Sequence, residues 1–156
     1  LFNKFTFRRF SLGIAVQAAA GMEVFNYVRY KNEGMSNLDN QSTSVLSRWQ
    51  YEGHETSIPR AVWEDPVGNS TFSTRWIEDG SYLRIRNITL SYKIPEKILA
   101  FRNLEIYISA NNLFTFSNYL GYDPEFAYSH SRIHMGSDYG QMPIPRQFMA
   151  GIKIGL

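Results

Sequence analysis

Four runs of the chain carry an apolar residue at every second position, and this alternation restricts the fold more than any other feature. Between Phe10 and Ala18 the even-numbered positions are apolar, while the odd-numbered positions are small or polar. The same alternation recurs at 88–92, 104–110 and 148–156. Successive side chains of a β-strand point to opposite faces, whereas a helix repeats every 3.6 residues. The sequence therefore predicts strands with one apolar face and one small, polar face.

The connections between these runs alternate in length. We expect four antiparallel strands, each pairing with its sequence neighbour, at about 9–21, 82–93, 104–116 and 147–156. Each is close to the 9 to 11 residues with which a tilted strand crosses a bilayer. Outer-membrane barrels alternate short periplasmic turns with long extracellular loops. The expected fold is thus all-β, part of a large transmembrane β-barrel, with residues 94–103 as the periplasmic turn and 21–81 and 117–146 as extracellular loops.

Two interruptions of the alternation need an explanation. Leu83 and Ile85 are odd-numbered, whereas Ile88 and the apolar positions after it are even-numbered. A β-bulge near 86–87 explains this shift, and so does a strand end that stands above the membrane, where lipid no longer enforces the pattern. The sequence leaves both open. Phe7 is likewise out of step with the run that begins at residue 10.

The first long segment contains two predicted helices and three tryptophans that are candidates for contact with a ligand or partner. The helices are expected at Met22–Asn32 and at Asn40–Trp49, the second capped by Asp39 or Asn40. Aromatic rings on a loop can stack on sugars or dock a partner protein, and they can also fill the interior of a folded loop. The candidate contact residues for substrate or a partner lid are Trp49, Trp63 and Trp76.

Composition excludes several functional classes. Sixteen Lys and Arg oppose 14 Asp and Glu, and the cations are scattered, so nucleic acid is not an expected partner. The chain has no cysteine, which removes disulfides, thiolate metal sites and thiol nucleophiles. The opening residues lack the apolar core of a secretory signal and do not begin with Met, and no run reaches the ~18 apolar residues of a transmembrane helix. We expect a fragment from the C-terminal part of a longer polypeptide.

Catalytic and metal motifs are weak. His130 and His134 are four residues apart, but neighbouring serines and Gly136 favour a loop over a zinc-binding helix. The paired carboxylates at 64–65 and 78–79 are typical of solvated loops more often than of a glycosidase site. No nucleophile elbow, Walker loop or dinucleotide fingerprint occurs. We therefore expect a protein that is not an enzyme, with no catalytic residue, no cofactor and no metal.

Several stretches resemble one family. Residues 75–92 read R-W-I-E-D-G-S-Y-L-R-I-R-N-I-T-L-S-Y and are similar, almost position for position, to a signature of SusC/RagA-type TonB-dependent outer-membrane transporters of Bacteroidetes. The stretch 110–115, A-N-N-L-F-T, and the stretch 121–125, G-Y-D-P-E, also resemble that family. Further similarity covers 40–49, 138–140 and 145–148, so the resemblance extends over essentially the whole chain.

This resemblance implies a role in transport. It implies a plug-filled barrel of about 22 strands, of which this chain supplies the last four. It also implies a SusD-like lipoprotein partner, energy from TonB through the missing N-terminal part, and import of glycans or, less often, peptides. One departure is Leu156, because family members usually end on an aromatic residue. From the residues alone, a soluble secreted β-sandwich that binds carbohydrate stays open as the alternative.

Overall fold

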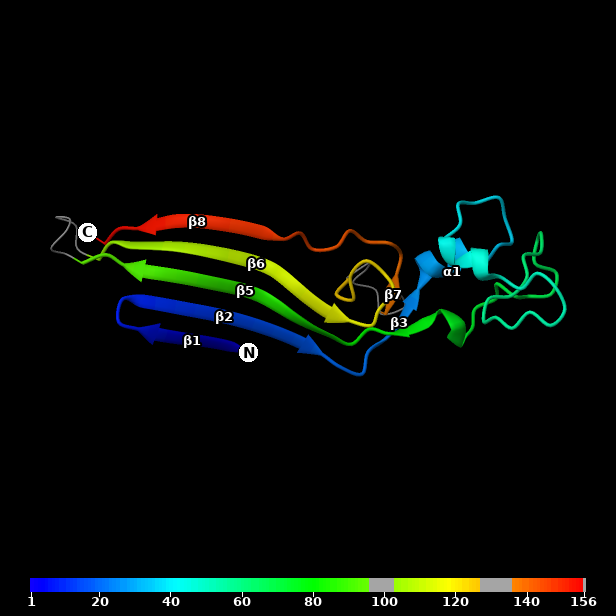
Figure 1. The fold of residues 1–156 in the computed structure, drawn as a ribbon, viewed down its shortest axis with the longest axis horizontal. Helices are drawn as coiled ribbons and strands as arrows, with labels where there is room; N and C mark the ends of the chain where they lie inside the picture. The colour runs from blue at the N-terminus through cyan, green and yellow to red at the C-terminus, as the bar shows by residue number, and fades with distance from the viewer. Residues whose placement is uncertain (96–102, 127–135, 156) are drawn as a thin grey trace. The chain divides into compact units, whose positions relative to one another are not determined.

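The computed structural model describes residues 1–95, 103–126 and 136–155 (Figure 1). The chain divides into two compact units. The first, called the sheet unit here, comprises Leu1–Ala20, Ser81–Asn118 and Ile144–Leu156. The second, called the loop unit, comprises Gly21–Gly80 and Tyr119–Pro143. The loop unit is therefore formed by the two long connections between strands of the sheet unit.

The sheet unit is a single antiparallel sheet with the strand order β1-β2-β5-β6-β8. Its strands are β1 (Phe2–Phe7), β2 (Phe10–Ala19), β5 (Tyr82–Lys93), β6 (Glu105–Ser117) and β8 (Gln147–Lys153). The four expected strands are β2, β5, β6 and β8, and each pairs with the next. The all-β antiparallel fold is thus confirmed.

A fifth strand, β1, was missed by the sequence reasoning. It pairs with β2 through a two-residue turn at Arg8–Arg9 that places Phe7 opposite Phe10, and Arg8 adopts a φ of +55°. Cross-strand partners point to the same face of a sheet. The odd-numbered Phe7 therefore shares a face with the even-numbered Phe10, which explains why the alternation changes phase at this point.

The phase shift in β5 is a β-bulge, the first of the two explanations that the sequence left open. Between β2 and β5 the register changes where Ala15 and Val16 face Asn87 and Ile85, so that Arg86 is the extra residue. The register with β6 shifts at the same place. Because one inserted residue reverses the alternation, the apolar residues on both sides of the bulge face the same way.

The loop unit contains short elements around a second, three-stranded sheet with the order β4-β3-β7. Strand β3 pairs antiparallel with β4 and parallel with β7. The elements of this unit are β3 (Glu23–Asn26), α1 (Tyr27–Glu33), the 3₁₀-helices η1 (Thr43–Ser47) and η2 (Thr74–Trp76), β4 (Ile77–Asp79) and β7 (Ser137–Asp138).

Both helix predictions were only partly right. The helix expected at Met22–Asn32 begins at Tyr27, because the preceding residues pair with β4 and the Asn26 side chain accepts a hydrogen bond from the Arg29 N–H at 2.9 Å. The helix expected at Asn40–Trp49 is only the short η1, capped by the Ser42 hydroxyl rather than by residue 39 or 40. Among the described residues, no helix is long and apolar enough to cross a membrane.

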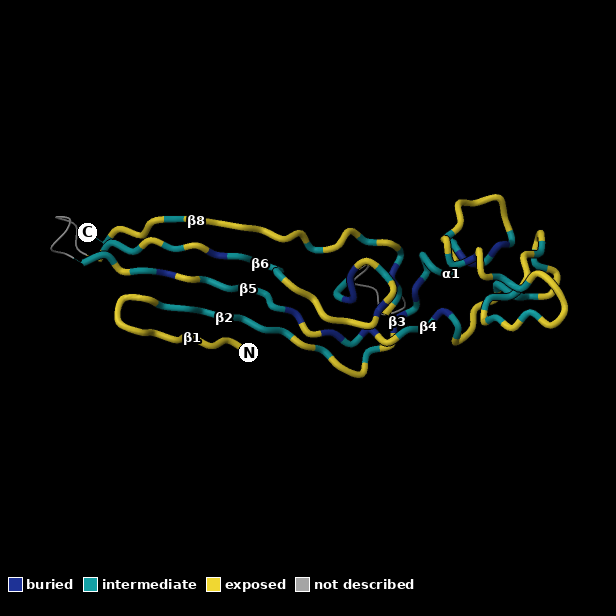
Figure 2. The backbone as a smooth tube through the Cα atoms, viewed as in Figure 1, coloured by how far each residue is buried: buried dark blue, intermediate teal, exposed yellow. Residues whose placement is uncertain are grey.

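Burial differs between the elements of the two units. Strands β1 and β8 are exposed along nearly their whole length, whereas buried positions occur on β5, β6 and in the loop unit (Figure 2). The apolar core of the loop unit comprises Val24, Met35, Val45, Trp76 and Tyr119. A compact core of this kind shows that the long connections fold into a defined structure rather than extended coil.

Candidate functional site

One face of the five-stranded sheet is apolar over most of its area. Register pairs place apolar residues beside one another in rows across the strands. One such row is Phe5, Leu12, Leu90, Ile108 and Ala150; another is Ile14, Ile88, Ala110 and Phe148. Much of this face is open: Ile108 is 60% exposed and Phe148 is 73% exposed. A continuous apolar surface of this size marks an interface with an apolar environment or partner.

The opposite face of the same sheet carries a polar network. The Asn87 amide donates to Ser109 Oγ at 2.8 Å and to Asn111 Oδ1 at 2.7 Å, while the Thr89 hydroxyl donates to Asn87 Oδ1 at 2.9 Å. Nearer the bulge, Gln17 accepts from Arg86 Nε at 2.5 Å. Cross-strand polar pairs of this kind stabilise a sheet face that contacts water or polar protein groups.

These two faces define the chemistry of the sheet. The sheet is an antiparallel meander that is apolar on one side and polar on the other. The described residues contain no helix or second sheet of comparable size, so the apolar side of the sheet is not buried within this chain. Soluble proteins rarely leave such a face open. The walls of transmembrane barrels have this construction, with lipid-facing and lumen-facing residues alternating along each strand.

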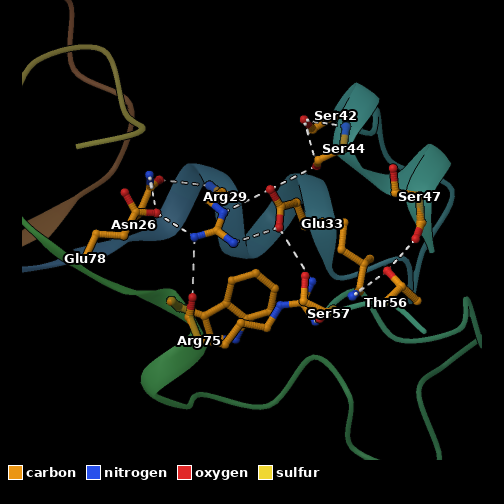
Figure 3. Close-up of polar contacts among 12 residues, drawn as sticks. Asn26, Arg29, Glu33, Ser42, Ser44, Ser47, Thr56, Ser57, Arg75 and Glu78 are labelled. Atoms are coloured by element: carbon orange, nitrogen blue, oxygen red, sulfur yellow. Dashed lines mark hydrogen bonds and ion pairs between the residues drawn. The ribbon is translucent and has the colours of Figure 1, made fainter. Parts of the chain in front are cut away.

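The centre of the loop unit is a balanced cluster of two arginines and two glutamates (Figure 3). Arg29 Nη1 donates to Glu78 Oε1 at 2.8 Å, and Arg75 Nη2 lies 3.6 Å from Glu33 Oε2. Ser44 Oγ donates to Glu33 Oε1 at 3.0 Å. The cluster joins α1, η1, η2 and β4, elements that are up to 49 residues apart in sequence. Its charges cancel, so it acts as a structural support rather than as a binding site for an ion.

The hydrogen bonds within this cluster shift the pKa values of Glu33 and Arg29. Burial disfavours the charged form of Glu33, but hydrogen bonds from Arg29 and Ser44 outweigh that effect and hold the pKa of Glu33 below its usual range. Burial also acts to lower the pKa of Arg29, yet its bonds to Glu33 and Glu78 raise that pKa above the usual value. Both shifts favour the ionised pair.

The three tryptophans occupy different environments. Trp76 is 0% exposed; its indole N–H donates to the Thr71 carbonyl at 3.0 Å, and the Arg75 guanidinium lies 4.8 Å from its ring centre. A buried Trp76 cannot contact substrate or a partner lid. Its ring instead fills the interior of the folded loop unit, the second role considered for these aromatic residues. Trp63 is 58% exposed, and Trp49 is partly exposed. The substrate or lid contact expected of Trp49 and Trp63 stays a prediction.

The W-I-E-D-G stretch has a physical role in the loop unit. Trp76 fills the core, Glu78 pairs with Arg29, and Gly80 meets β3 so closely that a Cβ there would lie 2.4 Å from Val24 Cγ2. The Gly80 N–H donates to the Met22 carbonyl at 2.8 Å. This stretch therefore anchors β4 to β3. The anchoring explains why an aromatic residue stands at position 76, a carboxylate at 78 and a glycine at 80.

The G-Y-D-P-E stretch has a comparable role. A Cβ at Gly121 would lie 2.3 Å from the Tyr119 ring, so only glycine fits. The Tyr119 hydroxyl donates to Asp138 Oδ2 at 2.6 Å, and burial together with this bond raises the pKa of Tyr119. A pocket of about 170 Å³ opens beside these residues, with Asn32 and Tyr122 in its lining. The pocket has no signal in the sequence, because its lining comes from segments that lie about 90 residues apart.

The paired carboxylates at 64–65 and 78–79, which lie within the described residues, have structural roles at Asp65 and Glu78. Asp65 closes a turn by accepting the Asn69 and Ser70 N–H groups at 2.7 and 2.6 Å, and Glu78 belongs to the ionic cluster. Within the described ranges, no group of three or more His, Cys, Asp or Glu residues is placed to hold a metal ion. His130 and His134, the zinc candidates, lie outside the described residues.

The sheet thus has the construction of a membrane β-barrel wall, and comparison with known proteins identifies which barrels it resembles. No protein-family model matches the chain. The TonB-dependent receptor P3 of Formosa agariphila is 31% identical over 160 residues, which cover 97% of this chain and 15% of that receptor. The TonB-dependent receptor SusC of Bacteroides thetaiotaomicron is 27% identical over 159 residues, which cover 99% of this chain and 14% of SusC. The chain is homologous to one segment of these TonB-dependent receptors.

Solved structures agree with this relationship. The RagAB peptide importer in its 'open-open' state matches with a TM-score of 0.81 and 25% identity, over 97% of this chain and 16% of that one. A structure of the RagAB peptide transporter matches with a TM-score of 0.80 and 27% identity, over 96% of this chain and 16% of that one. The fold is therefore that of part of a TonB-dependent receptor barrel, and the chain spans about one sixth of the proteins it matches.

Proposed function

We propose that this chain is a wall and outer-loop segment of a longer outer-membrane transporter, called the parent below. In this proposal the apolar face of the sheet contacts lipid, and the polar face contacts the barrel lumen. The loop unit lies on the extracellular side. The parent belongs in the bacterial outer membrane and imports an oligomeric nutrient, a glycan or less often a peptide, using energy delivered through TonB. It does not act as an enzyme.

The observation that carries the proposal is the exposed apolar face. Residues of five strands contribute to it, and the bulge at Arg86 keeps it continuous by restoring the phase of β5. In the described part of the chain, the only other sheet has strands of four, three and two residues, too few to cover such a face. The rival function, a soluble β-sandwich, needs a second sheet of similar size, so the structure favours the transporter.

The partners of the parent follow from the relatives. SusC and RagAB are, by name, a TonB-dependent receptor and a peptide importer. We propose a SusD-like lipoprotein as the lid that contacts the loop unit, with the rest of the barrel and a plug domain completing the wall and closing the lumen. Unpaired backbone groups at the outer edges of β1 and β8 support this completion, because an open edge in lipid costs several kcal/mol per unsatisfied group.

Arginine substitutions on the two sides of the sheet test the proposal. Leu90→Arg and Ile108→Arg place a charge on the apolar face in the middle of the sheet, at an expected cost of about 2 to 4 kcal/mol if that face meets the bilayer midplane. Both variants should reduce the amount of assembled, heat-resistant parent in the outer-membrane fraction.

The matched control is Thr6→Arg, which introduces the same charge one row away on the opposite, polar face, at an exposed residue. This variant should assemble as the unmodified parent does. If all three variants assemble equally well, the apolar face does not contact lipid. Recovery of the parent in the aqueous fraction without detergent would favour the β-sandwich instead.

A further inference from the structure

The pocket of about 170 Å³ in the loop unit, called the loop pocket here, has room for a single six-membered ring. Its described lining comes from β3, α1, the cap of η1, the stretch 120–122 and β7, all within the loop unit. A protein cavity of ~150 Å³ holds one benzene molecule. Pockets for drug-sized ligands occupy ~300 to 1,000 Å³. The loop pocket therefore suits one ring-shaped unit of a ligand rather than a whole oligomer.

Two charged residues line the loop pocket, and both already have partners. Arg29 Nη1 donates to Glu78 Oε1 at 2.8 Å (Figure 3). Asp138 accepts hydrogen bonds from the Tyr119 hydroxyl at 2.6 Å and from the Gly140 N–H at 2.8 Å. A charged ligand would have to break these bonds, and separating a buried charge from its partner is costly. The charge balance of the lining thus favours an uncharged ligand.

Two neutral residues of the lining keep their hydrogen-bonding capacity. In the described part of the chain, the Asn32 side-chain amide and the Tyr122 hydroxyl form no hydrogen bond with another protein group. An amide and a hydroxyl can each donate as well as accept. A sugar hydroxyl also donates and accepts, so these two groups match the hydrogen-bonding needs of a sugar.

The same pocket has an exposed apolar border. Leu120 is 71% exposed, and Tyr122 is 69% exposed. The side chain of Tyr122 combines an apolar ring with a polar tip. A pyranose has the matching construction, because its C–H bonds form an apolar face and its hydroxyl groups lie around the edge. Binding sites of this type combine aromatic walls with a small number of polar groups that fix the orientation of the ligand.

A peptide matches the loop pocket less well. Proteins recognise peptides through a free strand edge, a groove for an apolar helix face, or capture of a charged chain end. The edge strand that contributes to the pocket, β7, has only two residues, which is too short to pair with an extended peptide. The charged side chains in the lining are already engaged with protein groups. The observations therefore favour a sugar over a peptide.

We propose that the loop pocket binds one uncharged pyranose unit of a glycan. The Asn32 amide hydrogen-bonds to hydroxyl groups of the sugar, and Tyr122 packs against its apolar face. This inference rests on the proposed import of an oligomeric nutrient. It selects a glycan over a peptide and a neutral glycan over an anionic one.

Binding of defined oligomers to the purified full-length parent tests this proposal. The parent, held in mild detergent, is titrated calorimetrically with maltotetraose, a galactotetraose and a mannotetraose, and separately with tetragalacturonate and tetraalanine. We expect at least one of the neutral tetrasaccharides to bind, and neither the anionic tetrasaccharide nor the peptide to bind at the same concentration. Asn32→Ala and Tyr122→Ala should each weaken binding of that tetrasaccharide by roughly tenfold, because each removes a partner of the sugar.

Two control variants change the same residue types elsewhere in the loop unit. Asn40→Ala and Tyr51→Ala alter exposed residues outside the pocket lining. Both should bind the tetrasaccharide as the unmodified parent does. Hydrogen exchange of the loop unit establishes that each variant is folded before affinities are compared. Because Tyr122 is mostly exposed, Tyr122→Ala keeps the test valid even if Asn32→Ala loosens α1.

Three results would overturn the inference: no binding of any neutral tetrasaccharide, equally strong binding of tetragalacturonate or tetraalanine, or unchanged affinity in a folded pocket variant. Each leaves the proposed transport role intact as long as the parent is found in the outer membrane. A parent that needs no detergent would instead contradict the transport role itself, so the two failures are distinguishable.

Discussion

Arg29 and Glu33 form a two-bond ion pair one turn apart on α1, with Nε 3.0 Å from Oε1 and Nη2 3.2 Å from Oε2. The Glu33 side chain is only 6% exposed, so removal of its charge leaves Arg75 without its counter-ion and leaves Arg29 with Glu78 alone. We expect Glu33→Gln to lower the local free energy of unfolding of the loop unit by about 2 kcal/mol. Native-state hydrogen exchange of amides 27–47 in the parent measures this loss.

The control for this variant is Lys31→Gln, on the same helix. Lys31 pairs with Asp39 at 3.6 Å, but both side chains are well exposed. Exposed pairs contribute ~0.2 to 1 kcal/mol, so exchange should change little. Equal effects of the two substitutions would show that the buried cluster does not stabilise the loop unit.

The turn closed by Asp65 predicts acid sensitivity. Burial acts to raise the pKa of Asp65, but hydrogen bonds from Ser70 and Asn69 outweigh it and hold that pKa below its usual value. A carboxyl with a lowered folded-state pKa stabilises the fold above its unfolded-state pKa, and this stabilisation is lost as the pH falls through the folded-state pKa. Protection of the turn at 65–71 should therefore be full near neutral pH and decline in acid.

Asp65→Asn tests this assignment. The variant should show weaker protection of residues 65–71 at neutral pH and no further loss on acidification through the carboxyl range. Proteolytic nicking of the parent at several pH values provides the readout. Glu64→Gln, at the neighbouring exposed residue, should keep the pH dependence of the unmodified protein. An unaltered acid response in Asp65→Asn would assign the titration to another group.

The close contact between Gly80 and Val24 predicts a coupled pair. Gly80→Ala places a methyl group 2.4 Å from Val24 Cγ2, and overpacking of this kind typically costs about 1 to 3 kcal/mol. Val24→Ala removes the obstructing atom. The double variant should therefore be more stable than the sum of the single effects predicts. Thermal unfolding of the loop unit, followed by hydrogen exchange, gives the coupling energy, and simple additivity would contradict the contact.

Truncation of Trp76 should lower the stability of the loop unit, whereas truncation of Trp63 should leave it nearly unchanged. Trp76→Ala removes a fully buried ring and should cost about 3 to 5 kcal/mol of stability. Trp63→Ala removes a ring that is more than half exposed, so stability should change by less than about 0.5 kcal/mol. If Trp63 contacts substrate or the lid, uptake or lid binding by the parent should fall without loss of folded protein. Unchanged uptake would remove Trp63 from the contact surface.

Epitope tags test the direction of the chain across the membrane. Gly68 lies in a turn of the loop unit, where it adopts a φ of +74°. A tag inserted beside it should be labelled on intact cells, because the long connections are proposed to be extracellular. A tag within residues 96–101 should be labelled only after permeabilisation. The reverse labelling pattern would invert the proposed topology.

Much of the sheet could be predicted from the amino-acid sequence. The alternation of apolar residues located β2, β5, β6 and β8, because the side chains on each face of a strand match the polarity of what that face contacts. The phase change at Arg86 already indicated a possible bulge. The stretch at 75–92 revealed the family resemblance. These features are local, and each depends on residues close together in the chain.

The tertiary structure decided what depends on distant contacts. Strand β1 exists because it pairs with β2, and β3 replaced the first turn of an expected helix because β4 supplied hydrogen-bond partners some 50 residues away. Trp63 and Trp76 are the same residue type in one segment, yet packing alone made one exposed and the other buried. The sequence by itself determined the faces of the strands, since polarity alternates locally, whereas only the folded chain decided which charges pair and which cations stay exposed.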